Sequence, residues 1–279
     1  MKTRVISGIV GVLIAIVAVV NFYTIFFDIA AFAIYAIAVF EICRVFKEGN
    51  SKVTAIALWL VGILVVFNNI FKIEPMLTAT AFIAAIVCLV VFDFERVKFT
   101  SVASSVAMSL YVLFGVFCIT GLKNVLLFSE YGWDAAFMFV LCAGIAWGGD
   151  IMAYFSGYFF GKHKMAPKLS PKKTVEGAIG GVLGSVVIAF VMAFIYSKMG
   201  SISELSAVTS SYVVLALISV AGSCLGIIGD LFASAVKRQN GIKDYGTIMP
   251  GHGGVMDRFD SILFVAPVIY LMAGFVAKI

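Results

Sequence analysis

The stretch AIGGVLGSVVIAFVMAFIY, residues 178–196, is typical of a transmembrane helix. It holds no charged side chain, and its length is close to the roughly 20 apolar residues with which an α-helix crosses a bilayer. Similar runs recur, and they predict helices near residues 5–22, 28–46, 53–71, 76–92, 102–122, 135–160, 175–197, 208–235 and 256–277. We therefore predict an all-α, polytopic integral membrane protein with about nine transmembrane helices.

The composition supports this class. Of the 279 residues, 62% are hydrophobic and 13% are charged, whereas soluble domains average about 45–50% apolar and about 25% charged residues. These values exclude a soluble enzyme, a disordered chain and a secreted disulfide scaffold. We predict N-terminal transmembrane helices over residues 1–130 and a C-terminal catalytic region over residues 131–279, with polar loops at 161–174 and 237–255.

The positive charges predict the orientation in the membrane. If the N-terminus is cytoplasmic, the predicted helices place all of the 20 Lys and Arg residues on one side except Lys72, Lys123, Lys198 and Lys278. Cytoplasmic loops of membrane proteins carry an excess of Lys and Arg. We therefore expect a cytoplasmic N-terminus, with both long polar loops, and any active site that they form, facing the cytoplasm.

Three carboxylates near the C-terminus predict a metal site. Asp230 lies in the predicted helix 208–235, and Asp257 and Asp260 are three residues apart at the start of the last predicted helix, so they share a face. Carboxylates in apolar helices are costly unless they are paired, hydrated or metal-bound. Three oxygen ligands suit Mg²⁺ rather than zinc, so we expect these residues to bind Mg²⁺.

The segment between these acids combines bases with glycines. Its basic residues are Lys237, Arg238, Lys243 and Arg258. Its loop glycines are Gly251, Gly253 and Gly254, which let a backbone approach phosphate closely before a helix N-terminus. His252 either binds phosphate or orders the loop. Carboxylates beside phosphate-binding bases recur in phosphoryl and nucleotidyl transfer, although the balanced charges leave a salt-bridge network as the alternative.

The other polar loop is strongly basic. Its five lysines are Lys162, Lys164, Lys168, Lys172 and Lys173. We expect Lys172 and Lys173 to close over a triphosphate, and the alternative is a contact with anionic lipid. Thr174 is expected to cap the next helix, and Asp150 and Glu176 to orient the basic groups. Glu41 lies one turn from Arg44, and we expect a structural ion pair there.

Two segments resemble the phosphatidate cytidylyltransferases, also called CDP-diacylglycerol synthases. Residues 234–260 carry S-x-hydrophobic-K-R, four residues, K-D, and then a stretch that ends in H-G-G-hydrophobic-x-D-R-hydrophobic-D. Residues 150–181 carry D-x-x-A-Y-x-x-G and L-S-P-K-K-T-x-E-G-x-x-G-G. Met249, where the family usually has Ile, Leu or Phe, is a conservative departure.

The resemblance implies an integral inner-membrane enzyme that converts CTP and phosphatidic acid to CDP-diacylglycerol and pyrophosphate. It also implies a requirement for Mg²⁺, a monovalent cation such as K⁺ beside it, and a homodimer. We expect no nucleic-acid partner. The alternatives are a CTP-dependent lipid kinase and, from a different class, a membrane transporter, which would also bury Asp150 and Asp230. An alcohol phosphatidyltransferase is disfavoured because its D-G-x-x-A-R motif is not found.

Overall fold

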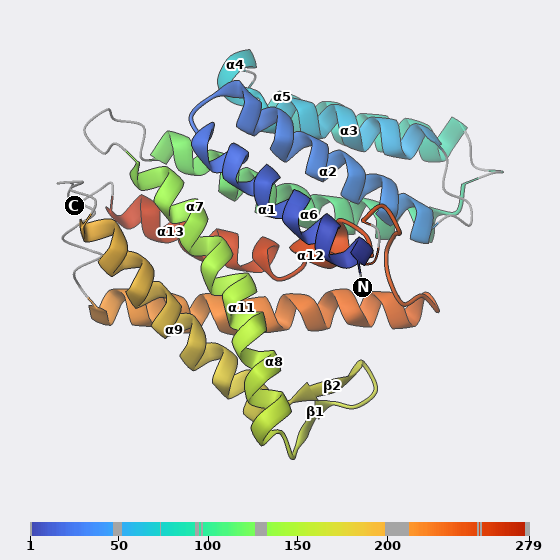
Figure 1. Cartoon of the computed structure of the whole chain (residues 1–279). Coiled ribbons are helices and arrows are strands. Elements are labelled where there is room, and N and C mark those ends of the chain that lie inside the picture. Colours follow the sequence, from blue (N-terminus) through green and yellow to red (C-terminus); the bar gives the residue numbers. More distant parts are fainter. Residues whose placement is uncertain are drawn as a thin grey trace. The chain divides into compact units, whose positions relative to one another are not determined.

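The computed structural model is shown in Figure 1. It describes residues 2–46, 52–72, 74–92, 95, 97–125, 133–198, 212–249, 251 and 253–276. The chain forms two compact units that alternate along the sequence. Unit 1 consists of Met1–Thr120 and Gln239–Arg258, and unit 2 consists of Gly121–Arg238 and Phe259–Ile279.

Unit 1 is built mainly from apolar helices of the N-terminal half. They are α1 (Lys2–Val20), α2 (Ile25–Val45), α3 (Lys52–Val66), α4 (Asn68–Phe71), α5 (Pro75–Phe92) and most of α6 (Phe99–Val125). Helix α2 packs against α1 and α3, and α3 packs against α5 (Figure 1). The α2–α3 contact is close because Gly62 leaves room for the ring of Tyr35, whose hydroxyl donates to the Leu58 carbonyl at 2.9 Å.

One long helix of unit 2 contains a π-helical turn. Helix α7 (Asp134–Ala143) continues through a π-helical turn, η1 (Gly144–Gly148), into α8 (Gly149–Phe160). The other helices of this unit are α9 (Val175–Lys198), α11 (Tyr212–Gln239) and α13 (Ile262–Val276). π-Turns are uncommon and often lie at functional sites, and Asp150 follows this one by two residues.

Glycines bring the helices of unit 2 close together. A Cβ atom on Gly180 would lie 2.1 Å from the Ser156 hydroxyl, and one on Gly181 would lie 2.9 Å from the Ala153 Cβ. Side chains of neighbouring helices also lie within 4 Å of a Cβ built on Gly144, Gly148, Gly184, Gly222 or Gly226. These contacts bring the helices close together, as expected where small residues let membrane helices approach.

The predicted class, an all-α polytopic membrane protein, is confirmed. Five described helices are long and apolar enough to cross a membrane: Ile25–Val45, Phe99–Val125, Asp134–Phe160, Val175–Lys198 and Tyr212–Gln239. Four shorter apolar helices are Gly8–Val20, Lys52–Val66, Met76–Phe92 and Ile262–Phe275. The chain is an all-α polytopic membrane protein. The number of nine spans and the cytoplasmic N-terminus stay predictions.

Three segments differ from the sequence-based expectation. The basic loop 161–174 contains an antiparallel hairpin of β1 (Lys164–Ala166) and β2 (Ser170–Thr174). The predicted helix 53–71 is interrupted at Phe67, between α3 and α4. The predicted continuous helix 256–277 is wrong, since α12 (Met256–Phe259) ends before α13 begins.

The break between α12 and α13 has a local cause. Asp260 and Ser261 form a turn, and Asp260 Oδ1 accepts a hydrogen bond from the Ser261 backbone N–H at 2.9 Å. Such a side-chain acceptor competes with helical hydrogen bonds. The break removes Asp260 from the regular helix that would have placed it directly above Asp257.

Candidate active site

Unit 2 brings three carboxylates into one electrostatic cluster. This carboxylate cluster consists of Asp150, Asp230 and Asp260, and the Asp260 residue is only 6% exposed. Burial raises the pKa of the Asp260 carboxyl, and the negative charge of Asp230 raises it further, whereas the positive charge of Lys237 lowers it. The carboxylates lie close enough to repel one another, so the cluster favours a bound cation.

Two lysines and a serine partly compensate the cluster. Lys173, on β2, forms an ion pair with Asp230 in which both side chains are 25% exposed. Lys237 is buried near Asp260. The Ser261 hydroxyl donates to Asp150 Oδ2 at 3.1 Å. The sequence did not point to this serine as a partner of Asp150.

The cluster fits Mg²⁺ by its chemistry. Among the described residues, no three His, Cys, Asp or Glu side chains are arranged so that they could hold a metal ion by themselves. Mg²⁺, however, is usually bound through one or two carboxylates, with water and substrate phosphates completing its six ligands. Asp230 and Asp260 could supply those two carboxylates. A complete metal site would therefore need the substrate.

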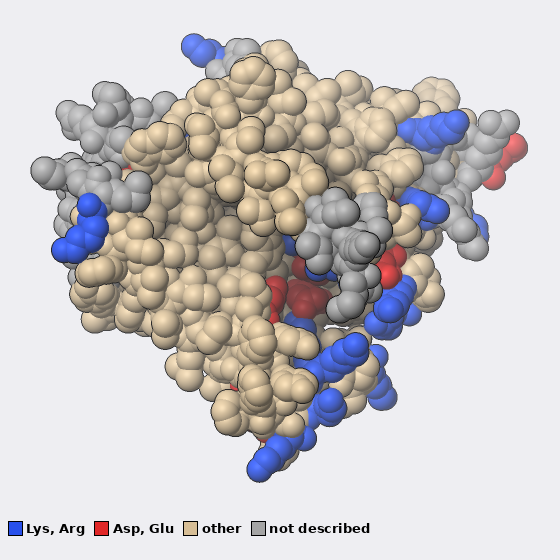
Figure 2. Space-filling view, in the orientation of Figure 1, with Lys and Arg blue, Asp and Glu red and all other residues tan. Residues whose placement is uncertain are grey.

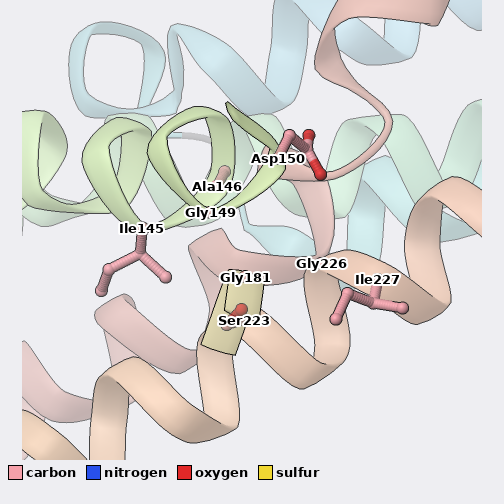
Figure 3. Close-up of a pocket in the computed structure, with 8 residues that line it drawn as sticks. All are labelled: Ile145, Ala146, Gly149, Asp150, Gly181, Ser223, Gly226 and Ile227. Carbon is pink, nitrogen blue, oxygen red and sulfur yellow. The ribbon is translucent and has the colours of Figure 1, made fainter. Parts of the chain in front are cut away.

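Beside α8 and α11 lies a small cavity of about 10 Å³, enough for about one water molecule. Its lining residues are Ile145, Ala146, Gly149, Asp150, Gly181, Ser223, Gly226 and Ile227 (Figure 3). The glycines keep three helices close together here. Figure 3 shows Asp150 and Ser223 as the polar side chains of this lining, so the cavity adjoins the carboxylate cluster.

In unit 1, residues 243–258, called here the glycine loop, line a cavity of about 560 Å³. This volume is within the range of about 300–1,000 Å³ that is usual for small-molecule sites. The lining residues are Lys243, Asp244, Gly246, Thr247, Met249, Gly251, Gly253 and Arg258. The structure thus brings together three predicted site residues: Lys243, Gly253 and Arg258. The predicted phosphate ligand His252 lies outside the described residues.

The backbone of the glycine loop requires glycine at two positions. Gly251 has φ 78° and Gly253 has φ 87°, a left-handed region that side chains with a Cβ rarely adopt. The Met249 N–H donates to the Gly253 carbonyl at 3.0 Å, which closes the turn. The predicted close approach of backbone to ligand is therefore physically possible at this turn.

Asp257 stabilises the glycine loop through hydrogen bonds to its backbone. Its Oδ2 accepts hydrogen bonds from the backbone N–H groups of Tyr245, at 2.8 Å, and Gly254, at 3.0 Å. Its role as a third metal ligand stays a prediction. The structure shows a carboxylate with one oxygen already engaged by the backbone.

Glu41 holds the same loop from α2, and the sequence did not predict this contact. Its two carboxylate oxygens accept hydrogen bonds from the backbone N–H groups of Val255, at 3.0 Å, and Met256, at 2.9 Å. The expected ion pair between Glu41 and Arg44 is wrong for the described structure, in which Arg44 is exposed. The sequence showed a carboxylate within a largely apolar helix, but it did not show which groups that carboxylate would contact.

Glu176 closes the base of the basic hairpin. Its carboxylate accepts hydrogen bonds from the backbone N–H groups of Lys162, at 3.1 Å, and His163, at 3.2 Å, and contacts the His163 ring at 2.6 Å. Glu176 therefore orients the hairpin backbone. The predicted Thr174 cap is confirmed, because its hydroxyl accepts the Gly177 N–H at 3.1 Å.

The lysines of the hairpin divide into two groups. Lys164, Lys168 and Lys172 are exposed, and Lys and Arg side chains gather on the surface of β1 and β2 (Figure 2). Lys173 instead turns to Asp230. Arg238, at the end of α11, donates from Nε to the Leu169 carbonyl at 3.4 Å and so connects α11 to the hairpin.

Comparison with known proteins gives a consistent result. The chain matches the cytidylyltransferase family over residues 2–276. It is 32% identical to the phosphatidate cytidylyltransferase of Bacillus subtilis, over 98% of this chain and 97% of that protein. It is 31% identical to the protein of the same name from Helicobacter pylori strain J99, over 98% of this chain and 92% of that protein. The Pseudomonas aeruginosa protein is 43% identical over 44% of this chain and 42% of its own length.

Proposed function

Because the chain belongs to the cytidylyltransferase family and is thus a nucleotidyltransferase, we propose that it transfers CMP from CTP to phosphatidic acid. The products are CDP-diacylglycerol and pyrophosphate. The observation that carries this proposal is the match over almost the whole chain to relatives named phosphatidate cytidylyltransferase. The carboxylate cluster and the glycine-loop cavity supply the two kinds of group that the reaction needs.

In the proposed reaction, a phosphate oxygen of phosphatidic acid attacks the α-phosphorus of CTP. A new P–O bond forms, the bond from the α-phosphorus to the bridging oxygen breaks, and pyrophosphate leaves with that electron pair. A phosphate monoester is largely ionised near neutral pH, since its second pKa is about 6, so the attack needs no dedicated general base.

The basic residues would bind and orient the phosphates. Lys243 and Arg258 line the glycine-loop cavity, and they are proposed to bind the triphosphate beside Gly253. Lys173 pairs with Asp230, so it is proposed to set the position of that carboxylate as well as to neutralise it. Lys172, Lys237 and Arg238 remain proposed phosphate ligands. Positioning and charge neutralisation are the main means of catalysis in such transfers.

A divalent cation is the proposed cofactor. Mg²⁺ held by Asp230 and Asp260 would neutralise charge on the triphosphate oxygens. A second, monovalent cation such as K⁺, a homodimeric state and a cytoplasmic-facing site in the inner membrane are further proposals. The site orientation is supported by the distribution of Lys and Arg along the sequence.

The test uses purified protein in detergent with phosphatidic acid, Mg²⁺ and CTP labelled in the cytidine. We expect label to enter the lipid, with one pyrophosphate released per lipid, and ATP not to replace CTP. Asp260→Asn should lower the rate by about 100-fold or more, since it removes a charged group from the metal and phosphate site. Asp28→Asn, in α2 and outside both groups of site residues, is the matched control.

The other outcomes of this experiment identify the alternatives. Release of CDP together with a newly phosphorylated lipid would indicate a lipid kinase. Flux of solute through proteoliposomes without any nucleotide turnover would indicate a transporter. Normal transfer by Asp260→Asn would contradict the assignment of the carboxylate cluster.

A further inference from the structure

Glu41 is a buried carboxylate in the N-terminal half, for which the sequence suggested no role in the reaction. The residue is 1% exposed. Its Oε1 accepts the Val255 N–H and its Oε2 accepts the Met256 N–H. A hydrogen bond to a charged group contributes more than one between neutral groups. Both carboxylate oxygens of Glu41 therefore bind the backbone at the end of the glycine loop.

Two glycines of the loop leave room for this carboxylate. A Cβ atom on Gly246 would lie 2.2 Å from Glu41 Oε1, and one on Gly254 would lie 2.6 Å from it. Neither glycine has a positive φ, so the backbone conformation alone does not require glycine at these positions. Glycine is required there because a side chain would overlap with the Glu41 carboxylate.

Glu41 and Asp257 act on the same stretch of backbone. Asp257 accepts the N–H groups of Tyr245 and Gly254, and Glu41 accepts those of the next two residues along the chain. The loop residues that line the cavity lie between and beside these contacts. Two carboxylates thus determine the path of the backbone that carries Lys243 and Arg258.

We propose that Glu41 is a positioning residue for nucleotide binding: it orders the glycine loop so that Lys243 and Arg258 face the triphosphate. This inference rests on the proposed function. It gives α2 a part in the active site through the loop backbone that Glu41 holds. Its loss should act on the affinity for CTP rather than on the affinity for the lipid.

The first test is Glu41→Gln, which keeps the size of the side chain. Its amide has one acceptor oxygen, and its NH₂ group cannot accept the second N–H. We expect the KM for CTP to rise about tenfold, as for the loss of one charge-assisted hydrogen bond, and the KM for phosphatidic acid to change less than twofold. Glu74→Gln, at an exposed site outside the loop, is the control.

Direct binding gives a readout that does not depend on turnover. Labelled CTP with Mg²⁺ is bound to the purified protein in detergent without lipid, and the Kd should rise about tenfold for Glu41→Gln. An unchanged Kd and KM for CTP, in protein whose wild type makes CDP-diacylglycerol, would overturn the inference. Failure of the wild type to make that product would instead overturn the proposed function.

A second variant tests the contact if Glu41→Gln does not fold. Gly246→Ala places a Cβ against the carboxylate and should also raise the KM for CTP about tenfold. In a protein that already carries Glu41→Ala, which removes the carboxylate, Gly246→Ala should change the KM for CTP by less than a further twofold. Gly11→Ala, where no atom lies within 4 Å, is the control. Equal effects of Gly246→Ala in both backgrounds would contradict the proposed contact.

Discussion

At the scale of single residues, Asp257 and Asp260 have different surroundings although they are three positions apart. Asp257 engages the backbone of the glycine loop through Oδ2. Asp260 lies in a turn, buried, with the charges of Asp230 and Lys237 around it. The charge of Asp260 is costly in this place. A buried charge of this kind is stabilised by a bound cation, and cation binding is therefore the role that we propose for Asp260.

Lys173 is the residue at which the basic hairpin and the carboxylate cluster meet. Lys173→Met retains the apolar stem but removes the ion pair with Asp230. We expect kcat/KM to fall about tenfold or more, because Asp230 loses its partner and its orientation. The measurement is steady-state kinetics in mixed micelles. Lys164→Met, exposed on β1, is the control, and equal activity of the two variants would contradict this role for Lys173.

At the scale of elements, the position of the cluster depends on how closely α8 and α9 pack. Gly177, Gly180 and Gly181 let α9 lie against the backbone of α8. Glu176 and Thr174 fix the start of α9 and the base of the hairpin. Asp150 is carried by α8 and Lys173 by the strand before α9, so this helix contact determines how the two residues face each other.

Gly180→Ala should destabilise this helix pair. Its Cβ would lie 2.1 Å from the Ser156 hydroxyl and 2.3 Å from its Cβ, and overpacking of this kind costs about 1–3 kcal/mol. We expect a lower thermal unfolding temperature in detergent, measured by intrinsic fluorescence. Gly274→Ala, with no atom within 4 Å, should leave it unchanged. A Gly180→Ala variant as stable as the wild type would show that Ser156 moves aside freely.

At the scale of the whole molecule, the compact units do not follow the order of the sequence. The segment Gln239–Arg258 belongs with the N-terminal helices, whereas the residues on either side of it belong to unit 2. Glu41 and the glycine loop therefore belong to the same unit, although they are far apart in the sequence. The N-terminal helices contribute Glu41 to the glycine loop, so the proposed role of this loop would make them part of the active-site scaffold.

The predicted orientation can be tested on the hairpin. In a variant in which the five native cysteines are replaced, Lys168→Cys places a single thiol on the exposed segment between β1 and β2. We expect a membrane-impermeant maleimide to label it in inverted membrane vesicles but not in intact spheroplasts, because basic segments remain cytoplasmic. The reverse pattern of labelling would contradict the cytoplasmic site.

Composition and apolar length were sufficient for the all-α membrane class, and the resemblance of two motifs was sufficient for the enzyme family. Apolar length, charge and motif spacing are local properties, and the cost of charge in a bilayer makes each acid in a helix informative. Motif residues such as Lys243, Gly253 and Arg258 could be identified in this way. The break at Asp260 was missed because its side chain competes with the helix only through a specific turn.

Only the tertiary structure decided which partners the charged groups take. Glu41 bonds to the N–H of a residue 214 positions away, Asp150 to Ser261 and Asp230 to Lys173. No local pattern specifies such contacts, since they depend on how helices and loops that are distant in sequence pack. A buried carboxylate requires hydrogen-bond donors. The sequence shows which carboxylates lie in apolar segments, but it does not show which groups donate to them.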